Sequence, residues 1–198
     1  MSTKLILIRH GETDWNLQGR YCGLQDVELN RKGKRQASLL YKRLKVGRIH
    51  KVYSSDRKRA IQTAKIVFKG LDIERLSDLR EMHFGIFEGL TYGQITKGYP
   101  QIYKKWLDSP LSSNIPQGEN FYSFRKRILK VVRKIVSLNY NKTIAIVCHG
   151  GTIGILINHI LKSRDFWRHI PASSSLSIVE YKNGKPKIRL LNDISHLS

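Results

Sequence analysis

KLILI at residues 4–8 and TIAIVC at residues 143–148 are the two stretches that decide the fold. Neither run alternates with polar residues, and such unbroken apolar runs are typical of strands that are buried on both faces of a parallel sheet. Two weaker strands are predicted at residues 51–54 and 176–181. The second of these alternates, so we expect it to lie nearer an edge of the sheet.

Helical periodicity separates the predicted strands. The clearest helix, over residues 121–138, has one apolar face, formed by Phe121, Phe124, Ile128, Val131, Ile135 and Leu138. Apolar residues recur in the same way over residues 37–44 and 60–67. Strands that alternate with helices predict an α/β fold in which helices cover both faces of the sheet. The length of 198 residues fits one domain, so we expect a single domain over residues 1–198.

The composition is that of a folded protein with a large positive charge. Hydrophobic residues make up 40% and charged residues 26% of the chain, which argues against disorder. Lys and Arg number 36 and Asp and Glu 15, giving a formal net charge of +21 that favours anionic ligands. Residues 31–69 hold much of this charge. We interpret it as solvated helix faces and expect no specific nucleic-acid partner.

The sequence shows neither a secretory nor a membrane-spanning segment. The apolar run before Arg9 is too short for a signal-peptide core, and the run at residues 153–157 is too short to cross a bilayer. Two cysteines, Cys22 and Cys148, are too few for a disulfide framework. We therefore expect a cytoplasmic protein without a membrane partner. The sequence leaves the oligomeric state open, with a homodimer as one option.

Each of the two apolar strands ends in a histidine. Arg9 and His10 follow the first strand, and His149 and Gly150 follow the second. If the strands are parallel neighbours, both imidazoles lie at the same edge of the sheet, where α/β proteins place their ligand sites. Arginine offers a fork of donors to phosphate oxygens, and a neutral imidazole is a nucleophile or base near neutral pH. A helix beginning at Gly150 would point N–H groups at an anion.

Two further motifs complete a family resemblance. Residues 9–16 (RHGETDWN), 54–64 (SSDRKRAIQTA), 79–89 (LREMHFGIFEG) and 148–151 (CHGG) together resemble the histidine phosphatase superfamily, also called phosphoglycerate mutase-like. The resemblance extends from about residue 4 to about residue 180. It implies a three-layer α/β/α sandwich with a mostly parallel central sheet.

The resemblance implies a set of catalytic residues. His10 matches the nucleophile that becomes phosphohistidine, and Glu81 matches the proton donor to the leaving oxygen. Arg9, Arg59 and His149 match a phosphate clamp. Two guanidinium groups and an imidazolium would supply the positive charge that phosphoryl transfer needs. A raised pKa of Glu81 is required if its carboxyl is to act as an acid near neutral pH, and we expect a bound phosphate to raise it.

The same resemblance implies substrate-binding positions at Thr13, Asn16, Gly23 and Gly150. Of the two nearby arginines in the second motif, Arg59 rather than Arg57 matches the family, because it directly precedes the alanine of RAxQT. The His and Cys residues show no metal-ligand spacing, so no metal or other cofactor is predicted.

The remaining histidines and Trp15 are given no catalytic role. We interpret His83 as structural or pocket-lining and Trp15 as a core contact. His50, His159, His169 and His196 have no motif around them and are taken as structural or surface residues. Residues 107–119 are expected to form a lid over the pocket.

Within the family, the pattern GLTY at residues 89–92 and the absence of an arginine pair after Trp106 resemble the phosphatase branch. The nearest likeness is to α-ribazole phosphatases and broad-specificity phosphatases of small molecules. The sequence therefore predicts a metal-independent phosphomonoesterase acting on a small phosphorylated metabolite, with α-ribazole 5′-phosphate as a candidate. The alternatives are a cofactor-dependent phosphoglycerate mutase and, from another class, a catalytically idle anion- or RNA-binding module.

Overall fold

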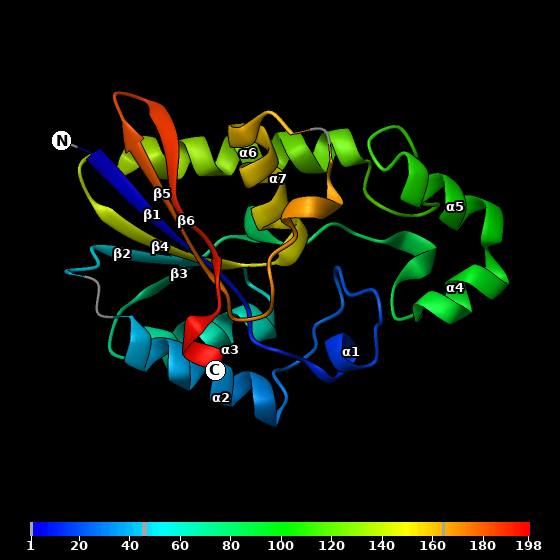
Figure 1. The fold of residues 1–198 in the computed structure, drawn as a ribbon, viewed down its shortest axis with the longest axis horizontal. Helices are drawn as coiled ribbons and strands as arrows, with labels where there is room; N and C mark the ends of the chain where they lie inside the picture. Colours follow the sequence, from blue (N-terminus) through cyan, green and yellow to red (C-terminus); the bar gives the residue numbers. More distant parts are fainter. Residues whose placement is uncertain (1, 45–46, 164) are drawn as a thin grey trace.

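The computed structural model describes residues 2–44, 47–163 and 165–198 (Figure 1). Within them one sheet has the strand order β3-β2-β4-β1-β5-β6. The first four strands in this order run parallel, and β5 and β6 are antiparallel to their neighbours. The strands are β1 Ser2–Arg9, β2 Lys51–Ser54, β3 Ile73–Arg75, β4 Thr143–Cys148, β5 Leu176–Lys182 and β6 Lys185–Asp193.

Helices cover both faces of the sheet, as predicted (Figure 1). α2 and α3 lie on one face and α6 and α7 on the other, whereas α4 and α5 project from one end of the molecule. The helices are α1 Asp14–Leu17, α2 Arg31–Arg43, α3 Lys58–Val67, α4 Tyr92–Gly98, α5 Pro100–Asp108, α6 Phe121–Leu138 and α7 Gly150–Leu161. No helix in the described ranges is long and apolar enough to cross a membrane.

The apolar run of β1 explains the three layers. Leu5 and Leu7 belong to the core shared with α6 and α7, whereas Ile6 and Ile8 belong to the core shared with α2 and α3. Because successive side chains of a strand point to opposite faces, an unbroken apolar run supplies both cores at once. The prediction of a doubly covered central strand is confirmed.

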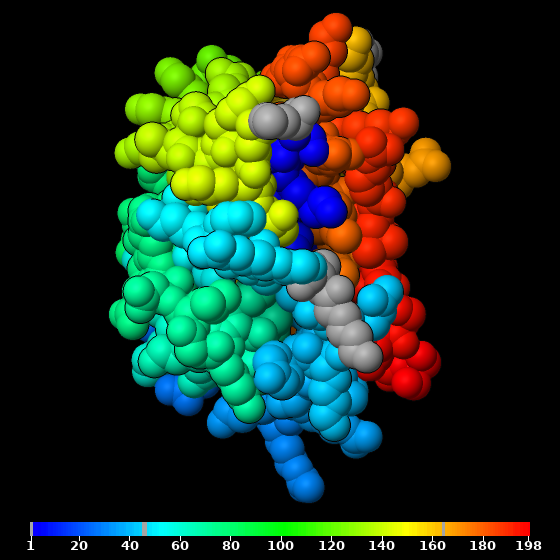
Figure 2. All heavy atoms as spheres, turned by 90° about the vertical axis from the view of Figure 1, so that its left-hand side faces the viewer, coloured from blue at the N-terminus to red at the C-terminus, as the bar shows by residue number. Residues whose placement is uncertain are grey.

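β1 and β4 are parallel neighbours whose register pairs Arg9 with Cys148. His10 and His149 therefore leave the sheet side by side at its carboxyl edge. Figure 2 views the opposite end, where the start of β1 is visible between α6 and the β5–β6 hairpin. The predicted strand at residues 176–181 forms β5, which lies between β1 and the edge strand β6 and so is nearer an edge than β1 and β4, as expected. Neither edge strand, β3 or β6, was predicted.

Candidate active site

The two histidines face each other beyond the ends of β1 and β4. Their ring centroids are 5.2 Å apart, with 65° between the ring planes. His10 is 4% exposed and His149 is fully buried. Nδ1 of His10 donates a hydrogen bond to the carbonyl oxygen of Gly11 over 2.8 Å. Because a carbonyl can only accept, this bond fixes the proton on Nδ1 and leaves the lone pair on Nε2.

The environment keeps both rings neutral. Burial, followed by the charges of Arg59 and Arg9, holds the pKa of His10 well below its ordinary value. Burial and the charge of Arg59 lower the pKa of His149 in the same way. A neutral His10 is the nucleophilic form. The imidazolium expected at His149 beside a phosphoryl group stays a prediction, and the burial and arginine charges that lower this pKa act against it.

Arg59 connects His149 to a loop. It is 1% exposed, and its Nε donates to Nδ1 of His149 over 3.3 Å. Its Nη1 donates to the carbonyl of Gln25 over 2.7 Å, and its Nη2 donates to that of Gly23 over 2.8 Å. Nε2 of His149 therefore carries the proton, which it donates to Oγ of Ser55 over 2.8 Å. Arg59 thus holds residues 22–25 against the histidine pair.

Glu81 is a buried carboxyl at the N-terminus of α7. Its Oε2 accepts the N–H of Gly151 over 2.8 Å, and its Oε1 accepts the N–H of Met82 over 3.0 Å. Burial raises the pKa of Glu81, although these two N–H groups and Arg9 oppose the shift. A bound phosphate was expected to raise the pKa of Glu81, and in the structure the main cause of the raised pKa is burial.

The glycine at position 151 permits this contact. A Cβ there would lie 2.5 Å from Oε1 of Glu81, so a larger residue would push the carboxyl away. His149 makes no side-chain cap at the start of α7. The Glu81 carboxyl supplies a cap instead, because the first N–H groups of a helix need partners from outside it.

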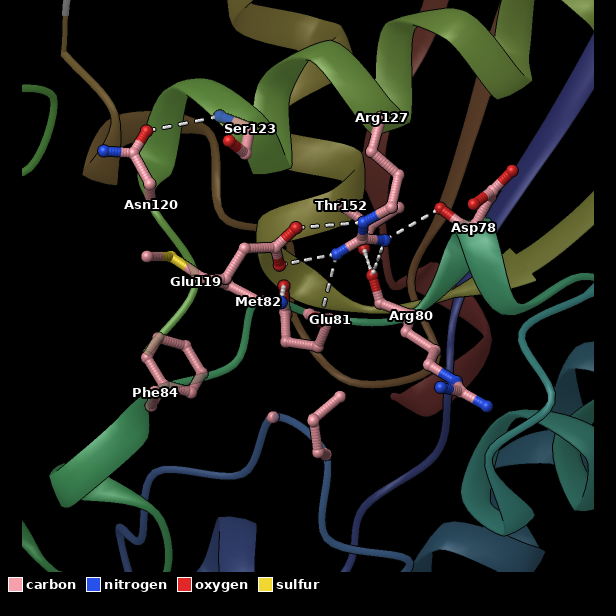
Figure 3. A network of polar contacts seen from close by, with 12 residues as sticks. Asp78, Arg80, Glu81, Met82, Phe84, Glu119, Asn120, Ser123, Arg127 and Thr152 are labelled. Atoms are coloured by element: carbon pink, nitrogen blue, oxygen red, sulfur yellow. Dashed lines mark hydrogen bonds and ion pairs between the residues drawn. The ribbon is translucent and has the colours of Figure 1, made fainter. Parts of the chain in front are cut away.

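Arg127 of α6 supports the segment that carries Glu81 (Figure 3). Its Nη2 forms an ion pair with Glu119 over 2.7 Å, and its Nη1 donates to the carbonyls of Asp78 and Arg80 over 2.9 and 3.0 Å. One side chain from a distant helix therefore fixes the backbone on the N-terminal side of Glu81. Neither Arg127 nor Ser55 was given a role from the sequence. Ser55 lies in the quoted motif at residues 54–64, whereas Arg127 lies in the predicted helix over residues 121–138.

The residues predicted to bind substrate divide into two groups. Asn16 and Gly150 line the cavity next to His10. Thr13 is buried and caps α1, and its N–H and Oγ1 both donate to Oδ1 of Asn16 over 3.1 and 3.0 Å. Gly23 lies behind the cavity wall. A Cβ on Gly23 would lie 2.0 Å from the carbonyl oxygen of Met82, so the close approach of two loops requires a glycine here.

The carboxylate of Glu88 joins those two loops. It accepts the N–H groups of Gly23 and Leu24 over 3.1 Å and that of Phe84 over 3.0 Å. Glu88 lies in the quoted third motif, but its position there does not reveal this role.

The cavity has a volume of about 330 Å³. We call the part lined by Arg9, His10 and Glu81, beyond the ends of β1 and β4, its inner end. Nη1 of Arg9 donates to the carbonyl of Pro171 over 2.5 Å. Arg20 and a wall of aromatic side chains line the rest of the cavity. This aromatic wall was not predicted from the sequence. It consists of Tyr21, Phe84, Phe124, Phe166 and Trp167. Among the described residues the cavity lining includes none from 107–119, so the predicted lid is wrong.

The segment expected to be a lid packs elsewhere. The carbonyl of Leu107 accepts a hydrogen bond from Nε1 of Trp167, and that of Pro116 accepts one from the N–H of Ile86. His83 is partly buried and does not line the cavity; its carbonyl accepts the N–H of Glu119.

Both cysteines are free thiols. Cys22 lines the cavity, and burial raises its pKa to about 11; Cys148 is buried in the core. Within the ranges that the structure describes, no cluster of three or more His, Cys, Asp or Glu side chains is arranged to hold a metal ion.

Two histidines and an arginine above the central strands of a parallel sheet, beside a protonatable carboxyl, define a class of α/β enzymes that handle phosphate groups. The histidine phosphatase superfamily (branch 1) model matches residues 5–194, and the chain belongs to this family. The enzyme is a hydrolase of phosphate monoesters.

Three relatives illustrate the similarity. The chain is 29% identical to phosphoserine phosphatase 1 of Hydrogenobacter thermophilus, over 98% of this chain and 94% of that protein. It is 28% identical to adenosylcobalamin/alpha-ribazole phosphatase of Salmonella typhimurium, over 96% of each. The structure of Bacillus stearothermophilus YhfR superposes with a TM-score of 0.93 at 32% identity, over 99% of this chain and 100% of that one.

Proposed function

We propose that the protein is a metal-independent phosphomonoesterase that acts through a phosphohistidine at His10. The observation that carries the proposal is the state of His10. The ring is neutral, its Nδ1 is held by Gly11, and it lines a cavity that also exposes Glu81. This arrangement offers a nucleophilic nitrogen and a proton donor to the same substrate.

The reaction follows from these positions. Nε2 of His10 attacks phosphorus, the N–P bond forms and the bond to the ester oxygen breaks, while Glu81 gives its proton to the leaving oxygen. Glu81, now a carboxylate, takes a proton from water as the water attacks the phosphohistidine. Inorganic phosphate leaves and His10 regains its lone pair. Dividing hydrolysis into two displacements replaces one difficult step with two easier ones.

The remaining residues hold the phosphoryl group. Arg9, Asn16 and Gly150 all line the cavity that also contains His10. Most of the N–H donors of Arg59 are engaged in hydrogen bonds to His149 and to the carbonyl oxygens of residues 22–25. Its contribution is therefore its charge and its hold on His149, and phosphoryl transfer depends mainly on such placement of charge.

The aromatic wall supports a substrate with a ring. Tyr21 and Phe84 pack edge to face with centroids 5.0 Å apart, and Trp167 lies on the same cavity. Rings of this kind favour a substrate whose leaving alcohol carries an aromatic ring. α-Ribazole 5′-phosphate fits this chemistry, and the name of the Salmonella relative supports it. Phosphoserine is the second candidate, because Arg20 on the cavity rim would pair with a carboxylate.

The test is phosphate release from a panel of esters in the presence of a chelator. The panel holds α-ribazole 5′-phosphate, phosphoserine, 3-phosphoglycerate, nucleoside monophosphates and sugar phosphates, each with and without 2,3-bisphosphoglycerate. We expect chelator-resistant release that favours α-ribazole 5′-phosphate over phosphoserine by about tenfold in kcat/KM. A preference for phosphoserine would replace the proposed substrate but keep the reaction.

Two results would overturn the reaction itself. Conversion of 3- to 2-phosphoglycerate that needs the bisphosphate, without phosphate release, would identify a mutase. Salt-sensitive binding of RNA without turnover of any ester would identify an anion-binding module.

A further inference from the structure

A second cavity, of about 510 Å³, lies between α6 and α7, away from the histidine pair. It is formed by the first turns of α6 and the last turns of α7, which cross one above the other in Figure 1. Its volume is in the range of small-molecule sites. The catalytic scheme above does not use it.

The inner part of this cavity is apolar. Phe121, Ile155 and Phe166 line it and are at most 7% exposed. The rings of Phe121 and Phe166 meet edge to face with centroids 5.0 Å apart. Leu111 lies at the mouth and is 52% exposed. A ligand that fills this space must present an apolar body, because rings and aliphatic chains offer no hydrogen bonds.

The rim of the cavity is cationic. Arg125 and Lys162 line it, and among the described residues neither forms an ion pair with a carboxylate. Nη2 of Arg125 is instead 3.4 Å from Nδ1 of His159. Burial and the charges of Arg125 and Arg133 lower the pKa of His159, so its ring is a neutral acceptor. The rim therefore holds positive charge without its own counter-ion, and an anion is the complementary group.

A polar group in the wall adds to this picture. Asn158 is 9% exposed, and its Nδ2 donates to the carbonyl of Phe166 over 3.3 Å. Its Oδ1 has no hydrogen-bond partner among the described residues. A buried acceptor without a partner is costly. A carboxylate brings no donor to this oxygen, so Asn158 is a polar point in the wall and the anion is held by the cationic rim.

We propose that this cavity binds a small carboxylate with an apolar body, its rings against Phe121 and Phe166 and its carboxylate on Arg125 and Lys162. Phe166 also lines the active-site cavity, so a bound ligand would steady one wall of that site. The proposal does not depend on the phosphatase mechanism.

The test is calorimetric titration of the full chain with 3-phenylpropionate, with saturating inorganic phosphate present to occupy the active site. We expect saturable binding that persists in phosphate. The neutral analogue 3-phenylpropanol should bind at least about tenfold more weakly, because the charge-assisted bonds are lost. Competition by phosphate, equal affinity for the alcohol, or no saturation at about 10 mM would overturn the proposal.

Paired variants separate the site from general charge. Arg125→Glu should weaken binding by at least about tenfold. Lys126→Glu carries the same charge change on the next, exposed residue of α6, which does not line the cavity, and should change affinity by less than about twofold. Equal losses in the two variants would contradict the site. Leu111→Trp, which narrows the mouth from an exposed position, should also weaken binding in a protein with an unchanged melting curve.

Discussion

The two ends of the active-site cavity are built differently. The inner end is set by the backbone, because His10 and His149 follow adjacent parallel strands and Glu81 caps a helix that begins at Gly150. The outer end is a wall of aromatic side chains from several segments far apart in the chain. The inner end leaves little freedom for the reacting atoms, whereas the outer end can change without disturbing them. The difference assigns chemistry to the first and choice of substrate to the second.

Removal of the nucleophile at the inner end should cause the largest loss of activity. His10→Ala should lower kcat by at least about 10³-fold, because no other group takes the place of a covalent nucleophile. The rate is measured by phosphate release from 4-nitrophenyl phosphate. His50→Ala, an exposed residue before β2, is the matched control and should retain its rate. Near-normal turnover in the His10→Ala variant would contradict the assignment of the chemistry to the inner end of the cavity.

The protonation of Glu81 should determine how kcat depends on pH. The raised pKa of Glu81 keeps its carboxyl protonated to higher pH than usual, and the lowered pKa of His10 keeps its ring neutral to lower pH. For phenyl phosphate, kcat should therefore be high between these two pKa values and fall as pH rises through that of Glu81.

Glu81→Gln should remove the alkaline fall and lower kcat by about 10²-fold for phenyl phosphate, but much less for 4-nitrophenyl phosphate, whose leaving group needs no proton. Glu74→Gln, in an exposed ion pair with Lys51, is the control. Equal losses on the two esters would argue against Glu81 as the acid.

A smaller effect is expected when the acid is displaced rather than removed. Gly151→Ala places a Cβ 2.5 Å from Oε1 of Glu81, so the carboxyl must move. We expect kcat for phenyl phosphate to fall about tenfold while Tm changes by less than about 4 °C, because the obstructed atom ends a flexible side chain. Gly98→Ala, in α4 with nothing near its Cβ, should leave kcat unchanged and should raise Tm slightly, because alanine is the better helix former. A large loss of Tm in Gly151→Ala would show that the effect is structural.

The outer wall should give the smallest effect, and only on some substrates. Trp167 packs edge to face on Trp106 and Phe166 and is 38% exposed. Trp167→Ala should raise KM for α-ribazole 5′-phosphate about fivefold and leave phosphoserine hydrolysis unchanged. Tyr140→Ala removes an exposed ring beyond α6 and serves as the control. An equal loss of activity on both substrates would contradict the assignment of substrate choice to the outer end.

The same division explains what the sequence could predict. Two apolar strands and their terminal histidines place the inner end, because each apolar run and the histidine directly after it can be read locally from the sequence. The parallel pairing of the two strands is a long-range property, and the sequence offered it only as a condition. The edge strand β6 was missed because its sequence, KPKIRLLND, is rich in charged residues and includes Pro186. Ser55 and Arg127 act through contacts 94 and 46–49 residues away along the chain, which no local pattern reports.

The predicted lid failed for a related reason. Residues 107–119 have the composition of a loop, and composition cannot say against which surface a loop packs. In the structure the carbonyls of Leu107 and Pro116 accept hydrogen bonds from Trp167 and Ile86. The aromatic wall depends on side chains that meet only after folding.

The central claim is a covalent phosphate on His10, and it is tested most directly by trapping that intermediate. The enzyme is mixed with excess substrate in the presence of a chelator, quenched in base and digested, and the peptides are analysed by mass spectrometry. We predict one phosphate on the imidazole of His10, and none in the His10→Ala variant. Phosphate on another residue, or turnover of wild-type enzyme with no phosphopeptide under the same quench, would contradict the mechanism.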